Sequence, residues 1–132
     1  MYLMKKIKSL SEDRIIIEGT VNGELAKFLV DTGASVGMFD SNQKISFGLA
    51  KGRKYNGTII GAGGRMKNVF NCDTFLHIGE KIIPQFLLAD IGNVVESIER
   101  DTGIKILGII SLPQMKMVGM GIDANDNLII LE

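Results

Sequence analysis

Short apolar runs, separated by glycine, asparagine and aspartate, follow one another along the whole sequence. The 132 residues include 16 glycines and only 2 prolines. This punctuation is typical of strands joined by tight turns rather than of long helices. Because 45% of the residues are hydrophobic, a chain of this length can bury a core without disulfides or metals. We therefore predict an all-β fold in a single domain that spans residues 1–132.

The charge balance and the cysteine content exclude several classes of function. The 15 basic and 15 acidic residues cancel and form no long block, so the basic surface of a nucleic-acid-binding protein is missing. With one cysteine, Cys72, and one histidine, His77, the chain cannot form an intrachain disulfide or a zinc site from these residue types. We expect no metal, no other cofactor and no nucleic-acid partner.

The N-terminal region predicts no membrane contact. Lysines lie at positions 5, 6 and 8, and the polar stretch 9–14 interrupts the sequence before any apolar run is long enough for a signal peptide or a membrane span. A single cysteine is consistent with a reducing compartment. We expect a cytoplasmic protein without a membrane partner.

The first predicted hairpin leads to an acidic turn. Residues 15–18 and 25–30 flank Asn22-Gly23, a pair that favours the positive backbone angles of a two-residue hairpin turn. The second strand ends in three consecutive apolar residues, 28–30, so we expect it to be buried on both faces. The turn that follows consists of Asp31, Thr32, Gly33, Ala34 and Ser35. A carboxylate directly after a buried strand is a candidate for catalysis.

Later segments continue the pattern of hairpins. Residues 54–60 and 66–70 are predicted strands on either side of the glycine-rich stretch 61–64, which predicts a hairpin with a pliable tip. Residues 71–78 and 81–89 are predicted to add two more strands.

The C-terminal third is predicted to contain helix as well as strand. Residues 93–100 suit either a short helix or a loop that ends at Gly103. Pro113, with Ser111 as the capping residue, predicts a short helix. A final hairpin is predicted from residues 117–123 and 128–131.

Hydrolysis of a peptide bond by carboxylates requires two of them close together. One is ionised and takes a proton from water, while the other is protonated and polarises the scissile carbonyl. Like charges in close contact enforce this division, and the pair titrates as a unit. Asp31 needs a second carboxylate for this chemistry.

Three motifs resemble the retropepsin-like aspartic proteases in the order expected for that family. Residues 28–35, Phe-Leu-Val-Asp-Thr-Gly-Ala-Ser, resemble its apolar strand and catalytic Asp-Thr-Gly turn. Residues 59–64, Ile-Ile-Gly-Ala-Gly-Gly, stand where the family has its flap. Ile106, Leu107 and Gly108 resemble its downstream motif of two hydrophobic residues and a glycine. With the C-terminal helix and closing strands, the resemblance covers residues 15–131.

The resemblance implies a retropepsin-like acid-protease half-barrel with a flap hairpin and one short C-terminal helix. It implies that Asp31 is the catalytic residue, that Thr32 braces the partner's turn, and that Ile106, Leu107 and Gly108 pack beneath the active-site loop. The residues implied to cover and bind the substrate are Ile60, Gly61, Ala62, Gly63 and Gly64.

The same resemblance implies a homodimer that cleaves extended polypeptides. Two Asp31 carboxylates, one from each subunit, would activate a water molecule. In the family, terminal strands of the two subunits interleave, and the corresponding segments here are residues 2–7 and 128–131.

The Asp-Thr-Gly and glycine-rich segments also allow interpretations other than a protease. A second Asp-Thr-Gly, residues 101–103, follows the largely polar stretch 96–100 instead of an apolar strand, so we interpret it as an exposed turn. A phosphate-binding loop at residues 61–64 would need a Gly-Lys-Ser/Thr ending and a helix, and the sequence predicts neither. A domain that binds peptides or dimerises without cleaving remains an alternative, although the intact Asp-Thr-Gly turn favours the enzyme.

Overall fold

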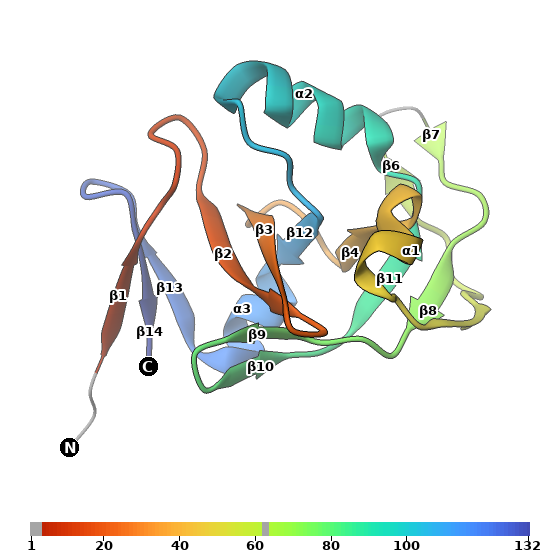
Figure 1. Ribbon diagram of the computed structural model, residues 1–132, viewed down its shortest axis with the longest axis horizontal. Helices are drawn as coiled ribbons and strands as arrows, with labels where there is room; N and C mark the ends of the chain where they lie inside the picture. Colours follow the sequence, from red (N-terminus) through yellow and green to blue (C-terminus); the bar gives the residue numbers. More distant parts are fainter. Residues whose placement is uncertain (1–3, 62–63) are drawn as a thin grey trace.

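Most of the secondary structure is β-strand, as predicted. The computed structural model describes residues 4–61 and 64–132 (Figure 1). Its largest sheet has nine strands in the order β10-β9-β2-β3-β12-β4-β11-β8-β5. In that order, the strands are β10 (Lys81–Ile83), β9 (Leu76–Ile78), β2 (Ile16–Val21), β3 (Glu24–Asp31), β12 (Gly108–Ser111), β4 (Gly37–Asp40), β11 (Phe86–Ala89), β8 (Phe70–Cys72) and β5 (Lys51–Lys54).

Two smaller sheets and four helices complete the described structure. A three-stranded sheet has the order β1-β14-β13, and a two-stranded sheet pairs β6 with β7. The strands are β1 (Lys5–Lys8), β14 (Leu128–Leu131), β13 (Met120–Asp123), β6 (Ile60–Gly61) and β7 (Gly64–Arg65), and the helices are η1 (Ser41–Gln43), α1 (Lys44–Phe47), α2 (Gly92–Thr102) and α3 (Leu112–Val118). No helix in the described part of the chain is long and apolar enough to cross a membrane.

The hairpin predicted around Asn22-Gly23 is formed by β2 and β3. Asn22 has φ 51° and Gly23 has φ 82°, and Val21 pairs with Glu24 across the turn. Positive φ at both central residues is what a two-residue hairpin requires, because such a turn matches the twist of the flanking strands. β3 then pairs with β2 on one edge and, in parallel, with β12 on the other.

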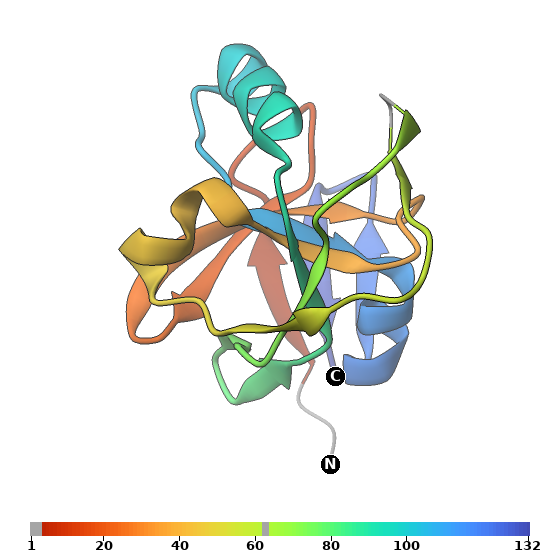
Figure 2. The same cartoon turned by 90° about the vertical axis from the view of Figure 1, so that its right-hand side faces the viewer.

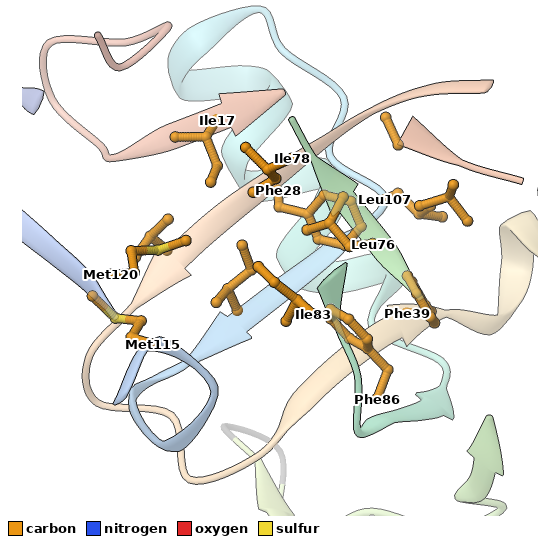
Figure 3. Packing of buried hydrophobic residues seen from close by; sticks show 14 of the residues in the cluster. Ile17, Phe28, Phe39, Leu76, Ile78, Ile83, Phe86, Leu107, Met115 and Met120 are labelled. Atoms are coloured by element: carbon orange, nitrogen blue, oxygen red, sulfur yellow. The ribbon is translucent and has the colours of Figure 1, made fainter. Parts of the chain in front are cut away.

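The central strand β3 is buried on both faces, as predicted from its apolar run. Phe28 and Val30 belong to one hydrophobic cluster, and Leu29 belongs to a second cluster on the opposite face. The first cluster contains stacked rings of Phe39 and Phe86, with centroids 4.2 Å apart, and is closed by Met115 of α3 (Figure 3). The second is covered by Val95 and Ile98 of α2. Packing of the two hydrophobic clusters against both faces of β3 therefore fixes the position of its C-terminal end.

Helix α2 resolves the choice between helix and loop that the sequence left open. It has 11 residues and ends at Gly103, which has φ 75° and donates its backbone N–H to the Glu99 carbonyl. Figures 1 and 2 show α2 above the central sheet, on the same side of the molecule as the β6–β7 hairpin. The predicted short C-terminal helix is confirmed as α3, and it extends to Val118, so the following strand begins later than predicted.

The hairpin predicted from residues 54–60 and 66–70 is much less regular than expected. Its ladder consists of β6 and β7, two residues each, and the next strand, β8, belongs to the central sheet. Residues 56–58 and 67–68 are exposed. Because this arm projects from the sheet, no neighbouring strand pairs with it and few of its side chains are buried.

The terminal strands pair within the chain instead of remaining free for a partner. β14 is the middle strand of its sheet and pairs antiparallel with β1 on one edge and β13 on the other. This differs from the expectation that residues 128–131 interleave with a second subunit, because both edges of β14 are already occupied. Of the predicted segment 2–7, Tyr2 and Leu3 lie outside the described residues. A partner strand can add at the outer edge of β1 or of β13.

Gly108 allows β12 to approach β4 and β3 closely. A Cβ atom at this position would overlap the backbone oxygen of Met38 and would lie 2.9 Å from Cε2 of Phe28. The preceding residues, Ile106 and Leu107, are buried, and Leu107 donates its N–H to the Lys27 carbonyl at 2.7 Å. The hydrophobic-hydrophobic-glycine motif therefore lies directly beside β3, the strand that carries Asp31, in the same sheet.

We predict that Gly108→Ala lowers the free energy of unfolding by about 2 kcal/mol or more, because the added methyl group overpacks the core. Gly121→Ala is the matched control, since a Cβ there meets no atom within 4 Å, and its cost should stay below about 1 kcal/mol. Urea unfolding of both variants measures the difference. Equal effects of the two substitutions would contradict the close approach at Gly108.

Candidate active site

Asp31 is the last residue of β3 and begins a tight turn. Its Oδ1 accepts a hydrogen bond from the Gly33 N–H at 2.9 Å, and its carbonyl accepts one from the Ala34 N–H at 3.1 Å. A Cβ at position 33 would lie only 3.3 Å from Oδ1, so glycine gives the backbone room to approach the carboxylate. Asp31 is half-buried. These bonds fix the carboxylate at the surface end of a buried strand.

The remaining turn residues differ in their environments. Thr32 and Ser35 are exposed, whereas Ala34 is half-buried. The Thr32 hydroxyl has no hydrogen-bond partner within residues 4–61 and 64–132, so it is accessible to a second molecule. Ala34 has no side-chain donor, and its contribution to the turn is through its backbone N–H and carbonyl.

The turn is braced by the start of α3. Ser111 is opposite Asp31 in the parallel β3–β12 pair, and the next residue, Leu112, donates its N–H to the Ala34 carbonyl at 3.3 Å. Ser111 is also the N-cap of α3. Since the helix begins where β12 ends, the same few residues stop the strand, cap the helix and hold the turn.

Gln114 is a buried polar residue that the sequence reasoning missed. It is 2% exposed, its Oε1 accepts from the Ser111 N–H at 2.9 Å, and its Nε2 donates to the Pro84 carbonyl at 2.8 Å. The side chain occupies the space beside Gly37, where a Cβ would overlap it. The spacing Ser111-x-x-Gln114 is the sequence signature of a capping box and could have revealed it. Gln114 therefore ties α3 to the start of β4 and to the segment before β11.

A cleft of about 470 Å³ opens at the Asp31 turn. The turn supplies its floor, the β6–β7 hairpin supplies one side, and the beginning of α2 supplies another. The lining residues are Asp31, Gly33, Ala34, Ser35, Val36, Met38, Ile59, Ile60, Gly64, Arg65, Met66, Asp90, Ile91, Asn93, Val94 and Ile109. The cleft is mostly apolar and has Asp31, Arg65 and Asp90 as its charged groups.

The predicted flap residues lie along the β6–β7 hairpin. Ile60 pairs with Arg65, and Gly61 pairs with Gly64. The Met66 N–H donates to the Ile59 carbonyl at 2.8 Å, which extends the hairpin by one bond. Ala62 and Gly63, the predicted tip, lie outside the described residues. Ile60 lines the cleft together with Ile59 and Met66. Its side chain is 78% exposed and is therefore available to contact a ligand.

The hairpin does not have the form of a phosphate-binding loop. In such a loop, glycines lead into the N-terminus of a helix, whose free N–H groups bind the phosphate. Here Gly64 has φ 102° and is followed by Arg65 in strand β7 and by the irregular segment leading to β8. The described part of the chain also contains no group of three or more histidine, cysteine or acidic side chains arranged as metal ligands.

The second Asp-Thr-Gly is the end of a helix. Asp101 forms an ion pair with Arg14 at 3.1 Å, and both side chains are substantially exposed. The Thr102 hydroxyl donates to the Ile98 carbonyl at 2.7 Å, as a residue in a last helical turn can. The exposed turn that we predicted is thus the C-terminal turn of α2, in which the Asp101 and Thr102 side chains have structural partners.

Asp90 closes the cleft at the start of α2. Its Oδ1 accepts hydrogen bonds from the Gly92 N–H at 2.9 Å and from Asn42 Nδ2 at 2.7 Å. These bonds, the Gly92 N–H foremost and then the Asn42 amide, lower the pKa of Asp90 below the ordinary value of 3.8, because they favour the ionised carboxylate. The side chain is exposed.

We predict a small pH-dependent contribution of Asp90 to stability. A carboxylate whose folded-state pKa is depressed stabilises the fold above its unfolded pKa and loses that effect as the pH falls through the folded pKa. Asp90→Asn should therefore lower stability near neutral pH, by less than about 1 kcal/mol because solvent screens the site. The difference from wild type should shrink below pH 3.8. Urea unfolding at several pH values measures it, and a difference that grows in acid would contradict the assignment.

The comparisons with known proteins agree with this geometry. The sequence model of the family described as aspartyl protease matches residues 17–97. The chain belongs to the aspartyl protease family. No curated protein sequence matches it.

Solved structures show that the fold is retropepsin-like. A retropepsin-like aspartic protease from Rickettsia conorii has a TM-score of 0.58 and 20% identity, over 99% of this chain and 96% of that one. EIAV protease complexed with the inhibitor HBY-793 has a TM-score of 0.58 and 22% identity, over 80% and 88%. The retroviral protease-like domain of Ddi1 from Leishmania major has a TM-score of 0.55 and 20% identity, over 90% and 87%. The retropepsin-like fold predicted from the sequence is therefore confirmed.

Proposed function

We propose that residues 1–132 form one domain of a homodimeric aspartic endopeptidase in which two Asp31 carboxylates, one from each subunit, activate a water molecule. The observation that carries the proposal is the place of Asp31. It lies at the end of the central strand, in an Asp-Thr-Gly turn that opens on a cleft lined by a glycine-rich hairpin. Membership of the aspartyl protease family supports the same reaction.

The reaction uses the two carboxylates in different protonation states. Two carboxyl groups in contact cannot both ionise easily, so the pair shares one proton. The ionised group takes a proton from water, and the resulting hydroxide attacks the scissile carbonyl carbon. The protonated group donates a hydrogen bond to the carbonyl oxygen, which gains negative charge. Breaking of the C–N bond then requires transfer of a proton to the leaving amine.

The hydrogen bond from the Gly33 N–H to Oδ1 of Asp31 orients the carboxylate for this role. Oδ1 is held by the backbone, and Oδ2 is left to face water or the partner's carboxylate. Rigid support from β12 and α3 keeps the carboxylate in place, and such preorganisation avoids a cost of reorientation during the reaction.

The substrate is an extended polypeptide held between the turn and the hairpin. Gly61 and Gly64, which pair across the hairpin, allow its backbone to come close to the substrate. Ile60 and the apolar lining of the cleft contact substrate side chains, while the hairpin excludes water from the reacting bond.

Dimerisation is part of this mechanism because one chain supplies one Asp31. A two-fold axis brings identical turns together, and the exposed Thr32 hydroxyl braces the turn of the other subunit. The outer edge of β13 is a suitable place for contact between subunits, because α3 packs on β13 and also holds the Asp31 turn through Leu112.

We predict that Asp31→Asn reduces cleavage of peptides by at least about 100-fold, because it removes the group that takes the proton from water. Asp101→Asn, in the second Asp-Thr-Gly, is the matched control and should retain wild-type activity. The assay uses a denatured polypeptide mixture and identifies cleavage sites by mass spectrometry, with a pepstatin-type transition-state mimic as inhibitor.

Cleavage at the original rate by purified Asp31→Asn protein would refute the catalytic role. If neither wild type nor Asp101→Asn cleaves any peptide while both are folded dimers, the protein is a binding or dimerisation module instead of an enzyme.

We predict that inactive subunits suppress active ones. When wild type is mixed with a tenfold excess of Asp31→Asn protein, most wild-type subunits pair with an inactive partner and each mixed dimer has one catalytic carboxylate. Activity should fall about tenfold, as random pairing requires. An equal excess of Asp101→Asn protein should increase activity. Unchanged activity after mixing with the inactive subunit would mean that the dimer does not exchange or that one chain is sufficient, and sedimentation of the mixture distinguishes these.

A further inference from the structure

The side-chain amide of Asn42 joins two carboxylates from different strands. Its Nδ2 donates to Asp40 Oδ1 at 2.9 Å and to Asp90 Oδ1 at 2.7 Å. Both N–H bonds of the amide are thus directed at acidic oxygens. The carboxylates come together because β4 and β11 run parallel, with Ala89 opposite Asp40, so that Asp40 ends one strand and Asp90 follows the other.

One end of this cluster is fixed in the core. Asp40 is 2% exposed, and its Oδ2 accepts from Gln43 Nε2 at 3.0 Å. The same Gln43 nitrogen lies 3.0 Å from the Ile106 carbonyl oxygen, its second acceptor. A buried carboxylate with its oxygens satisfied holds its partners rigidly. Asn42 is therefore anchored to the motif that supports the active-site strand.

The other end of the cluster fixes the beginning of α2. The N-cap residue of α2 is Ile91, whose side chain makes no capping hydrogen bond. Asp90 takes over this role by accepting from the Gly92 N–H. The packing is close, since a Cβ at Gly92 would lie 3.1 Å from Asp90 Oδ1 and 3.2 Å from Asn42 Nδ2. The first turn of α2 is thus positioned by Asp90 and Asn42.

This first turn is a wall of the cleft. Ile91 and Val94 line the same cleft as Asp31 and the hairpin residues Ile59 and Ile60. Figure 1 shows that the first turn of α2 is the end of the helix nearer to β6. The opposite end of α2 is held by the ion pair between Arg14 and Asp101 and does not line the cleft. A shift of the first turn would change the width between α2 and the hairpin.

We propose that Asn42 and Asp90 are positioning residues that set the size of the subsite formed by Ile91 and Val94, and so determine which substrate side chain the cleft accepts. This inference rests on the proposed function, in which the cleft holds an extended peptide. Neither residue takes part in the bond-breaking step. Their contribution is the placement of α2 relative to the hairpin.

The test compares peptides that differ in one apolar side chain, from alanine through valine and leucine to phenylalanine, at the position that contacts this subsite. Asn42→Ala removes both hydrogen bonds of the amide. We expect the preference among these peptides, measured as the ratio of kcat/KM values, to change by about fivefold or more, because a pocket discriminates by how closely it fits a side chain. The change should appear mainly in KM, while kcat for the best peptide stays within about twofold.

Three further variants separate positioning from general destabilisation. Arg14→Ala removes the ion pair at the far end of α2 and should leave the preference unchanged even if it lowers stability. Asp90→Ala should change the preference as Asn42→Ala does, whereas Asp90→Asn retains an oxygen acceptor and should restore most of it. Because Asp90 is exposed, its variants test the inference if Asn42→Ala fails to fold.

A readout that does not need catalysis completes the experiment. Amide hydrogen exchange in residues 91–95 should accelerate in Asn42→Ala and Asp90→Ala but not in Arg14→Ala. If wild type cleaves no peptide, the proposed function fails, and the same preference is measured as the Kd of non-cleavable versions of the peptides. An unchanged preference in both Asn42→Ala and Asp90→Ala, or an equal change in Arg14→Ala, would overturn the inference.

Discussion

The parallel pairing of β3 with β12 is the interaction on which the site depends. It brings Ser111 opposite Asp31, so the strand that carries the carboxylate and the strand that leads into α3 end together. The pairing is possible at this depth because Gly108 has no side chain between β12 and its neighbours. The turn after β3 is held rigidly, because backbone hydrogen bonds on both edges of β3 oppose any displacement of the strand. The carboxylate is therefore held by the core of the molecule instead of by flexible surface contacts.

Around this pairing, apolar clusters and buried polar side chains stabilise different parts of the structure. Apolar clusters on both faces of the sheet position the strands, and the rings of Phe28, Phe39 and Phe86 fill the first cluster. Buried polar side chains connect elements that the strands leave apart. Gln114 links α3 to the segment before β11, and Asp40 links β4 to Gln43. Each of these groups has its hydrogen bonds satisfied, which is the condition under which buried polar atoms add specificity without a net penalty.

Local signals in the sequence were sufficient for much of the fold and for the candidate site. Asn22-Gly23 specifies its hairpin turn through backbone angles, and the run 28–30 before Asp31 specifies a buried strand. The nature of residues 93–100 stayed open because α2 begins without a side-chain cap on its own N-cap residue. The link between Asn42 and Asp90 joins residues 48 positions apart, and no local pattern reports such a contact. Strand partners are equally non-local, which is why the pairing of β1 with β14 within one chain was not predicted, whereas the final hairpin of β13 and β14 was.

Because β14 lies between β1 and β13, its backbone pairing is complete within one chain and does not need a second subunit. In an interlaced dimer, each chain completes its terminal sheet with strands of the other, so a lone subunit is left with unpaired backbone groups and its stability depends on protein concentration. Here β1 and β13 already satisfy both edges of β14. In the proposed homodimer, each subunit would therefore have both edges of β14 paired before association, and association would join two folded subunits. The concentration of the protein would then control the proposed activity, because dilution separates folded subunits that each carry one Asp31 and a higher concentration brings them together.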